Sequence, residues 1–181
     1  MRSIGRDGIH PGARQVASPN FDDRPPGVAV TLLVLHAISL PPGEFGGDAI
    51  ERLFTNRLDP TAHRSFAELR SLRVSAHFLV RRGGELIQFV PLHRRAWHAG
   101  ASCWRGRPRC NDFSIGVELE GVAGRKFTDV QYAQLCALVR ALRAALPLRE
   151  IAAHSDIAPG RKTDPGGQFD WPRLFATLAM A

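Results

Sequence analysis

The chain has 181 residues, of which 44% are hydrophobic and 23% are charged, values typical of one globular domain with one core and not of a disordered chain. Its net charge is +7, but the arginines are scattered and form no basic stripe with interleaved aromatics, which argues against nucleic acid and favours an anionic ligand. No apolar run reaches the roughly 18–20 residues that cross a bilayer, so we expect no membrane insertion.

The first predicted element of secondary structure follows an irregular N-terminal segment. Residues 1–27 are rich in proline, glycine and charge and show no periodicity, so we expect them to wrap the surface of a single domain that spans residues 1–181. Residues 28–36 are then almost continuously apolar and end on His36, a pattern typical of a strand buried on both faces.

A short helix and a hairpin are predicted next. After the turn-rich stretch 40–47, Asp48 is placed to cap a helix whose apolar side chains share one face, namely Ile50, Leu53 and Phe54. Residues 55–73 are polar and poorly periodic, and we expect a long loop there. Within residues 74–91, two strand-forming runs flank a Gly-Gly pair, which is a good hairpin signal.

The second half of the chain alternates strands with helices. After an irregular segment over 92–112, residues 113–120 indicate a strand, and Thr128 opens a capping box at the start of a long amphipathic helix. Residues 149–153 indicate another strand, and Asp170 caps a last helix whose apolar stripe we expect to be core: Trp171, Leu174, Phe175 and Leu178. These elements predict an α/β domain with a central mixed sheet flanked by helices.

Three potential metal ligands fall where predicted strands end. His36 closes the first strand, His154 follows the strand over 149–153, and Asp164 lies ten residues further on, in a loop bounded by proline and glycine. Open α/β sheets gather ligands beyond the ends of such strands. Two imidazoles and a carboxylate suit a catalytic zinc, which keeps a fourth position open. The pattern predicts zinc at one sheet edge; the alternative is an ordinary cluster of hydrogen-bonded side chains.

Two kinds of charged group are candidates for catalysis. Lys162 is one of two lysines among 24 basic residues, and its ammonium is a compact charge suited to a developing oxyanion. Glu118 and Glu120 share one face of their strand, because side chains alternate with period two. If that face lines a cleft, one of them can act as general base in metal-assisted hydrolysis; if it is solvated, both are surface residues. The residues alone do not choose between the two.

The remaining histidines and the cysteines carry weaker signals. His77 lies mid-strand among apolar residues, as a hydrogen-bonded core histidine does, whereas His98 follows Trp97 in a segment suited to a groove that stacks on sugar rings. The three cysteines are odd in number and form no C-x-x-C pair, which argues against a disulfide framework. Because the N-terminus also lacks the apolar core of a secretory signal, we expect a cytoplasmic protein.

Six segments together carry a family resemblance: 18–24, 35–47, 72–77, 95–100, 110–121 and 154–166. They resemble the AmpD-type 1,6-anhydro-N-acetylmuramyl-L-alanine amidases of bacterial peptidoglycan recycling, and the resemblance extends over nearly the whole chain. These enzymes belong to a zinc amidase superfamily that also includes the peptidoglycan recognition proteins. The resemblance therefore implies the α/β fold of that superfamily.

The resemblance also implies a role for each candidate residue. It implies one zinc per chain bound by His36, His154 and Asp164, with Glu118 as general base and Lys162 as the stabiliser of the transition state.

Further positions match those that hold the muropeptide in the family: Arg73, Trp97 and Arg109. Ala76 stands where some phage relatives carry a tyrosine, which leaves the role of base to the glutamate. Ala37 stands where several close relatives have asparagine, which puts one hydrogen bond to the substrate in doubt but not the chemistry.

The implied function is that of a zinc-dependent N-acetylmuramoyl-L-alanine amidase in cytoplasmic muropeptide recycling. It would hydrolyse the amide between 1,6-anhydro-N-acetylmuramic acid and L-alanine of the stem peptide, with small anhydro-muropeptides as substrates and no obligate protein partner. The rival interpretation is a non-catalytic muropeptide-binding module that has lost a zinc ligand. The presence of all three ligands and of the glutamate–lysine pair argues against it.

Overall fold

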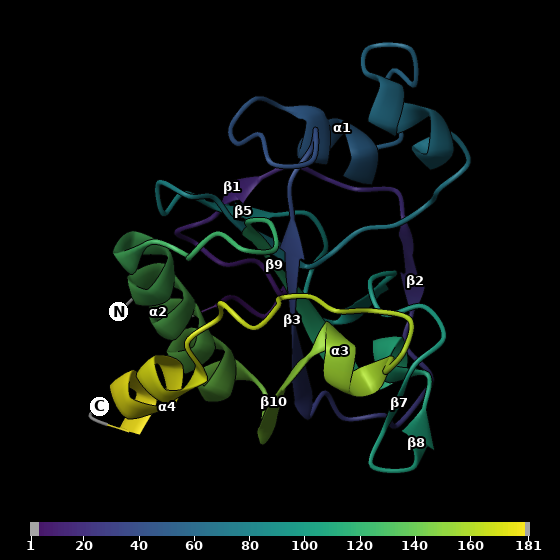
Figure 1. The fold of residues 1–181 in the computed structure, drawn as a ribbon. Helices are drawn as coiled ribbons and strands as arrows, with labels where there is room; N and C mark the ends of the chain where they lie inside the picture. Colours follow the sequence, from purple (N-terminus) through teal and green to yellow (C-terminus); the bar gives the residue numbers. More distant parts are fainter. Residues whose placement is uncertain (1–3, 180–181) are drawn as a thin grey trace.

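A six-stranded mixed sheet organises the computed structural model, which describes residues 4–179 (Figure 1). In spatial order its strands are β1 (Arg14–Gln15), β5 (Leu86–Gln88), β4 (Phe78–Val80), β9 (Ser114–Glu120), β3 (Leu32–Ile38) and β10 (Glu150–Ala153). Strands β4, β9, β3 and β10 run parallel, whereas β5 is antiparallel to β4 and β1 runs parallel to β5. The predicted α/β class with a central mixed sheet is confirmed.

Helices cover both sides of this sheet. Helices α2 (Asp129–Ala145) and α4 (Trp171–Ala179) lie together on one face, and α3 (His154–Ile157) lies on the opposite side (Figure 1). The short helix α1 (Ala49–Phe54) and the 3-10 helix η1 (Arg64–Leu69) follow β3 along the chain. Within residues 4–179, no helix combines the length and the apolar character needed to span a bilayer.

Two small ribbons complete the fold. Strand β2 (Phe21–Asp23) pairs antiparallel with β6 (Arg94–Ala96), and β7 (Cys103–Trp104) pairs with β8 (Arg107–Pro108). A 3-10 helix, η2 (Cys110–Phe113), then leads directly into β9. The segment over 92–112, expected to be irregular, thus contains three very short strands.

The two faces of the sheet differ in polarity near its centre. On one face, side chains of β3 and β9 form a continuous apolar cluster with α2 and α4, including Leu33, Leu35, Ile115, Val117 and Leu119. On the other face the apolar core is divided into two clusters, one containing α1 and η1 residues and the other containing residues of η2 and α3. Here β9 contributes Ser114, Gly116 and Glu118, which makes room for polar chemistry.

The elements with strong local signals are confirmed. The first apolar run forms a strand, although β3 begins at Leu32 and continues two residues beyond His36 to Ile38. The Gly-Gly pair joins β4 to β5, and α2 starts with the predicted capping box between Thr128 and Gln131. Asp170 accepts a hydrogen bond from the backbone N–H of Arg173, 2.9 Å away, at the start of α4.

Other expectations differ from the structure. Residues 55–73 are not all loop, because η1 forms around the buried Phe66. The stripe on α4 is core at Leu174 and Leu178, but Phe175 is 46% exposed and stacks on Trp171. The expectation that Phe175 is core was wrong because α4 lies at the edge of the fold and packs against α2 with only part of its apolar face.

His77 lies just before β4 and is fully buried, as expected for a core histidine. Its Nδ1 accepts a hydrogen bond from the backbone N–H of Gly116 (3.0 Å), so its ring proton lies on Nε2, which is 3.1 Å from the carbonyl oxygen of Arg94. Burial lowers the pKa of His77 well below its ordinary value, and the nearby charge of Arg24 lowers it further. The folded protein therefore keeps His77 neutral.

This burial predicts a pH-dependent loss of stability. Unfolded His77 takes up a proton below its ordinary pKa of about 6.5, whereas folded His77 does not. The stability it contributes is therefore present above that pH and falls as pH decreases, by up to about 1.4 kcal/mol per pH unit. Urea titrations of metal-free protein give the free energy of unfolding at pH 7 and at pH 5. The loss between these two pH values should be smaller for His77→Gln than for wild type. Equal pH dependence of the two proteins would contradict this account.

Candidate metal centre

The register of three neighbouring strands brings three polar side chains level with one another. His36 in β3 is the pairing partner of Glu118 in β9, and Ala153 at the end of β10 pairs with Leu35, so that His154 follows level with His36. Level residues of adjacent parallel strands project to the same face and lie about 4.8 Å apart. The sheet therefore places Glu118, His36 and His154 in one row across β9, β3 and β10.

His154 occupies the first position of α3 and not a loop, as the sequence had suggested. The Asp156 carboxylate accepts a hydrogen bond from the backbone N–H of Ala153 (2.8 Å), which fixes the point where β10 turns into α3. The loop after α3 then returns to the sheet edge, where the backbone N–H of Ser155 donates to the carbonyl oxygen of Asp164 (3.0 Å). This bond brings the Asp164 side chain beside the two histidines.

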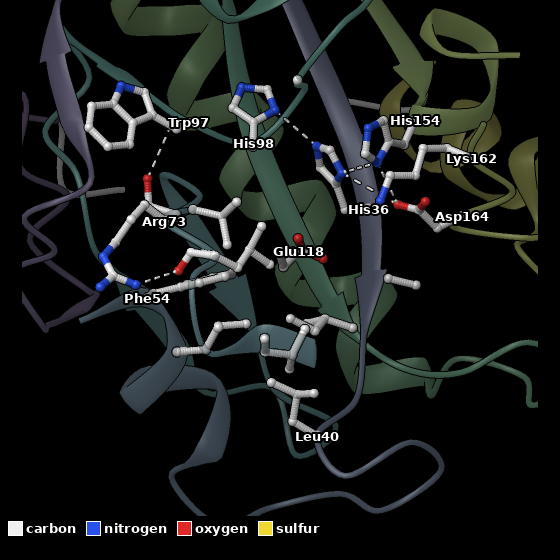
Figure 2. A pocket seen from close by; sticks show the side chains of 18 of the residues that line it. His36, Leu40, Phe54, Arg73, Trp97, His98, Glu118, His154, Lys162 and Asp164 are labelled. Atoms are coloured by element: carbon white, nitrogen blue, oxygen red, sulfur yellow. Dashed lines mark hydrogen bonds and ion pairs between the residues drawn. The ribbon is translucent and has the colours of Figure 1, made fainter. Parts of the chain in front are cut away.

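His36, His154 and Asp164 present three ligand atoms to one point. The two Nδ1 atoms are 2.9 Å apart, and Oδ2 of Asp164 lies 3.1 Å from Nδ1 of His154 and 3.4 Å from Nδ1 of His36 (Figure 2). Ligand atoms of a tetrahedral zinc with bonds of about 2.0–2.1 Å are about 3.3 Å apart. The triangle has close to the size of one face of such a site.

The protonation of these groups also fits a cation. Nε2 of His154 lies 3.4 Å from the carbonyl oxygen of Ala99, an atom that can only accept, so the ring proton belongs on Nε2 and Nδ1 presents a lone pair. Burial lowers the pKa of His36 to about 4, which keeps that ring neutral at pH 7. Burial alone would raise the pKa of Asp164, but its contacts with His154 and His36 hold that pKa well below its ordinary range. Two imidazoles and a carboxylate are a zinc donor set.

Glu118 and Lys162 lie beside the triangle without structural partners. Burial raises the pKa of Glu118 well above its ordinary value, and the charge of Asp164 adds to this, whereas Lys162 opposes it. Within residues 4–179, Oε2 of Glu118 is buried with no hydrogen-bond partner, and no ion pair or hydrogen bond engages the Lys162 ammonium. Both groups are therefore free to act on a bound molecule.

Glu120, two residues further along β9, has a carboxylate that is fully used in contacts that stabilise the fold. Its carboxylate accepts hydrogen bonds from the Arg81 guanidinium (3.0 Å) and from the backbone N–H groups of Gly46 (2.7 Å) and Arg82 (3.0 Å). These bonds hold the loop before α1 against the end of the sheet. The contrast distinguishes the two glutamates that the sequence alone could not separate.

A cavity of about 470 Å³ opens in front of the row, within the size range of small-molecule sites. Its floor contains the ligand triangle, Glu118 and Lys162, and its wall is apolar, formed largely by residues of α1, η1 and the end of β3 (Figure 2). A second hollow of about 290 Å³ shares Ala37, Ile38 and Asp164 with the first. All three potential ligands therefore face the larger cavity, and Asp164 also borders the second hollow.

The residues expected to hold substrate are placed differently from one another. Arg73 and Trp97 line the larger cavity, on the side away from Lys162 (Figure 2). The side chain of Arg109 is 70% exposed, pairs with Asp112 at 3.2 Å, and is not part of either cavity lining. His98 does line the cavity, but its ring is buried and bonded to His36, so it offers no face for a sugar.

Sequence reasoning missed the groups that support this site from outside. Asn111 and Arg161 bind the backbone of residues 98–101, and no spacing in the chain indicates these contacts. The residue types did not indicate this supporting role either, because Asn111 lies in a segment expected to be irregular and Arg161 is one arginine among many.

Comparisons with known proteins agree with this site. The profile of the N-acetylmuramoyl-L-alanine amidase family matches residues 26–167. The chain is 58% identical over 165 residues to 1,6-anhydro-N-acetylmuramyl-L-alanine amidase AmpD from Escherichia coli strain K12, covering 90% of each chain.

Solved structures show the same similarity. A crystal structure of a selenomethionine derivative of AmpD superposes with a TM-score of 0.95 at 52% identity, over 98% of this chain and 99% of that one. The E. coli amidase AmiD, solved with the substrate anhydro-N-acetylmuramic acid-L-Ala-D-γ-Glu-L-Lys, superposes with a TM-score of 0.61 at 27% identity, over 87% of this chain and 65% of that one.

The different surroundings of the two glutamates predict opposite effects on stability. Glu120→Gln removes the charge that pairs with buried Arg81, and should lower the free energy of unfolding by about 1.5–3 kcal/mol. Glu118→Gln replaces a buried carboxylate that lacks a partner, and should leave the free energy of unfolding unchanged or raise it. Urea titrations of both variants without metal measure the difference, and an equal loss in both would refute the distinction.

Proposed function

The chain belongs to the N-acetylmuramoyl-L-alanine amidase family and is an amidase of that type, and on this premise we propose that it is a zinc enzyme of muropeptide recycling. The proposed reaction is hydrolysis of the amide between the lactyl group of 1,6-anhydro-N-acetylmuramic acid and L-alanine of the stem peptide. The observation that carries the proposal is the convergence of three potential ligand atoms beside an unpartnered buried carboxylate oxygen.

His36, His154 and Asp164 would bind one zinc ion. Their donor types and spacing fit the metal, and all three residues line the larger cavity, which leaves a position open toward it. Bound there, zinc would supply a Lewis acid that polarises the substrate carbonyl and makes water more acidic.

Glu118 is the proposed general base. Its buried carboxylate, with a raised pKa, takes a proton from the water that attacks the carbonyl carbon. The C–N bond then breaks, and Glu118 returns that proton to the leaving amine of L-alanine. Lys162 holds its positive charge beside the oxygen that becomes negative in the transition state. Because neither group is engaged by the fold, both can serve the reaction without losing a structural contact.

The shape of the site suits a molecule with a sugar on one side and a peptide on the other side of the amide bond to be hydrolysed. The two hollows meet beside Asp164, and the larger contains Arg73 and Trp97. The substrate in the AmiD complex has this composition. We assign Arg73 to a carboxylate of the stem peptide, since a guanidinium can donate two hydrogen bonds to one carboxylate. Trp97 offers an aromatic face, and Arg109 is a third proposed contact, at the periphery.

A cytoplasmic location is part of the proposal. Cys103, Cys110 and Cys136 carry free thiols, which suits a reducing compartment. Anhydro-muropeptides reach the cytoplasm in the recycling that the AmpD resemblance implies, and the substrate would be a small molecule there.

Metal analysis tests the zinc assignment directly. Purified protein should contain about one zinc per chain, and Asp164→Ala should lose both the metal and hydrolysis. Glu118→Gln is the matched control: it should keep the zinc but lose on the order of 10²–10⁴ in kcat, the scale of general acid–base catalysis. Active protein that contains no metal and is insensitive to chelators would refute the zinc assignment. Fully active, zinc-loaded Glu118→Gln would place the base elsewhere.

Steady-state kinetics test the assignment of the arginines. Arg73→Ala should raise KM for an anhydro-muropeptide about tenfold or more with a smaller change in kcat, because the lost contact is present in both the ground state and the transition state. Arg109→Ala should raise KM less, since Arg109 lies outside the cavity lining. The assignment is wrong if KM is unchanged in Arg73→Ala, or if a substrate without stem-peptide carboxylates is affected equally.

A further inference from the structure

One short segment contacts both histidines of the triangle from behind. His36 and His154 turn Nδ1 toward Asp164 and Nε2 toward the segment that contains His98 and Ala99. Nε2 of His36 is 2.9 Å from Nδ1 of His98, and Nε2 of His154 is 3.4 Å from the carbonyl oxygen of Ala99. A histidine that binds a metal through Nδ1 must carry its proton on Nε2 and donate it to an acceptor. Both acceptors come from adjacent residues.

The direction of the bond between His36 and His98 is fixed by a chain of hydrogen bonds. Ser114 donates its only hydroxyl proton to the carbonyl oxygen of Cys110, 2.6 Å away. Its oxygen can therefore only accept from Nε2 of His98, which lies 3.2 Å away. The neutral ring of His98 then carries its proton on Nε2 and leaves Nδ1 free to accept from His36. A backbone carbonyl thus determines which nitrogen of His36 is free for a metal.

Close packing prevents His98 from leaving this position. Its ring lies against the backbone of Gly116, where a Cβ atom would be only 2.4 Å from Cγ of His98. This contact explains why β9 has glycine in the middle of a buried strand, where glycine is otherwise unfavourable. The residue is only 8% exposed, so little solvent reaches the acceptor.

The backbone of the segment is held from two directions. Oδ1 of Asn111 accepts from the N–H groups of His98 (3.2 Å) and Ala99 (2.8 Å). The Arg161 guanidinium donates to the carbonyl oxygens of Ala99 (2.8 Å) and Ala101 (2.7 Å). Arg161 belongs to the same loop as Asp164, so the loop that carries the carboxylate ligand is also tied to the segment that orients the histidines.

We propose that His98 and the carbonyl group of Ala99 form a support that sets the tautomer and the orientation of both metal-binding histidines, with His98 as a positioning residue. This inference rests on the proposed function, because it concerns how the same site retains zinc. Without the acceptor on His98, the Nε2 proton of His36 would be buried and unpaired, which costs free energy. The ring would then favour the tautomer with the proton on Nδ1, and that proton occupies the lone pair needed by the metal.

The test compares two substitutions of His98. His98→Phe keeps a ring against Gly116 but has no acceptor, whereas His98→Asn places an amide oxygen where Nδ1 lies. Zinc dissociation constants measured by chelator competition should rise about 10–100-fold for His98→Phe and return most of the way to wild type for His98→Asn. His93→Phe, at an exposed position, is the control and should match wild type. Urea unfolding without metal verifies that each variant is folded.

A second measurement does not depend on zinc. Nitrogen-15 NMR of metal-free wild-type protein should show His98 with its proton on Nε2, and Ser114→Ala should mix the two tautomers. Wild-type zinc affinity in His98→Phe, or His98 protonated on Nδ1 in the wild type, would overturn the inference. If the wild type itself binds no zinc, the proposed function fails, and the tautomer still decides whether this support exists.

Discussion

The site depends on holding three potential ligand atoms, two imidazole nitrogens and one carboxylate oxygen, within 2.9–3.4 Å of one another. Such close grouping of side chains from distant segments has to be enforced by the fold. Parallel pairing of β9, β3 and β10 sets the positions of the side chains. Apolar packing on both faces keeps these strands from moving apart. Such rigidity would favour an ion that binds its ligands in tetrahedral geometry.

Features with a local cause could be predicted from the sequence. An apolar run ending on His36 is a buried strand because only a central strand can bury every side chain, and the Thr128 capping box satisfies backbone donors within a single turn. The grouping of His36, His154 and Asp164 followed from the same reasoning, since the ends of parallel strands meet at one edge. Two strands that end on histidines, with a carboxylate in the loop that follows the second, were enough to predict the grouping.

Features that arise between distant segments could not be predicted. The bonds from His98 to His36 and from Ala99 to His154 join residues 62 and 55 positions apart, and they come from a segment without periodicity. The sequence therefore suggested a sugar-stacking role for His98, whereas burial and hydrogen bonding direct its ring inward. Phe175 was misjudged for a related reason: a helical stripe shows which side chains share a face, but not how much of that face a neighbour covers.

Glu118 and Glu120 show how one strand can serve both structure and chemistry. They project to the same face, yet Glu120 accepts three hydrogen bonds and Glu118 has a buried oxygen with no partner in residues 4–179. A carboxylate stabilised by several donors is a weak base, because those donors stabilise its charged form. A carboxylate buried without them holds its proton more tightly and is suited to proton transfer at neutral pH. The absence of structural partners at Glu118 is therefore what would make it available for the proposed role of general base.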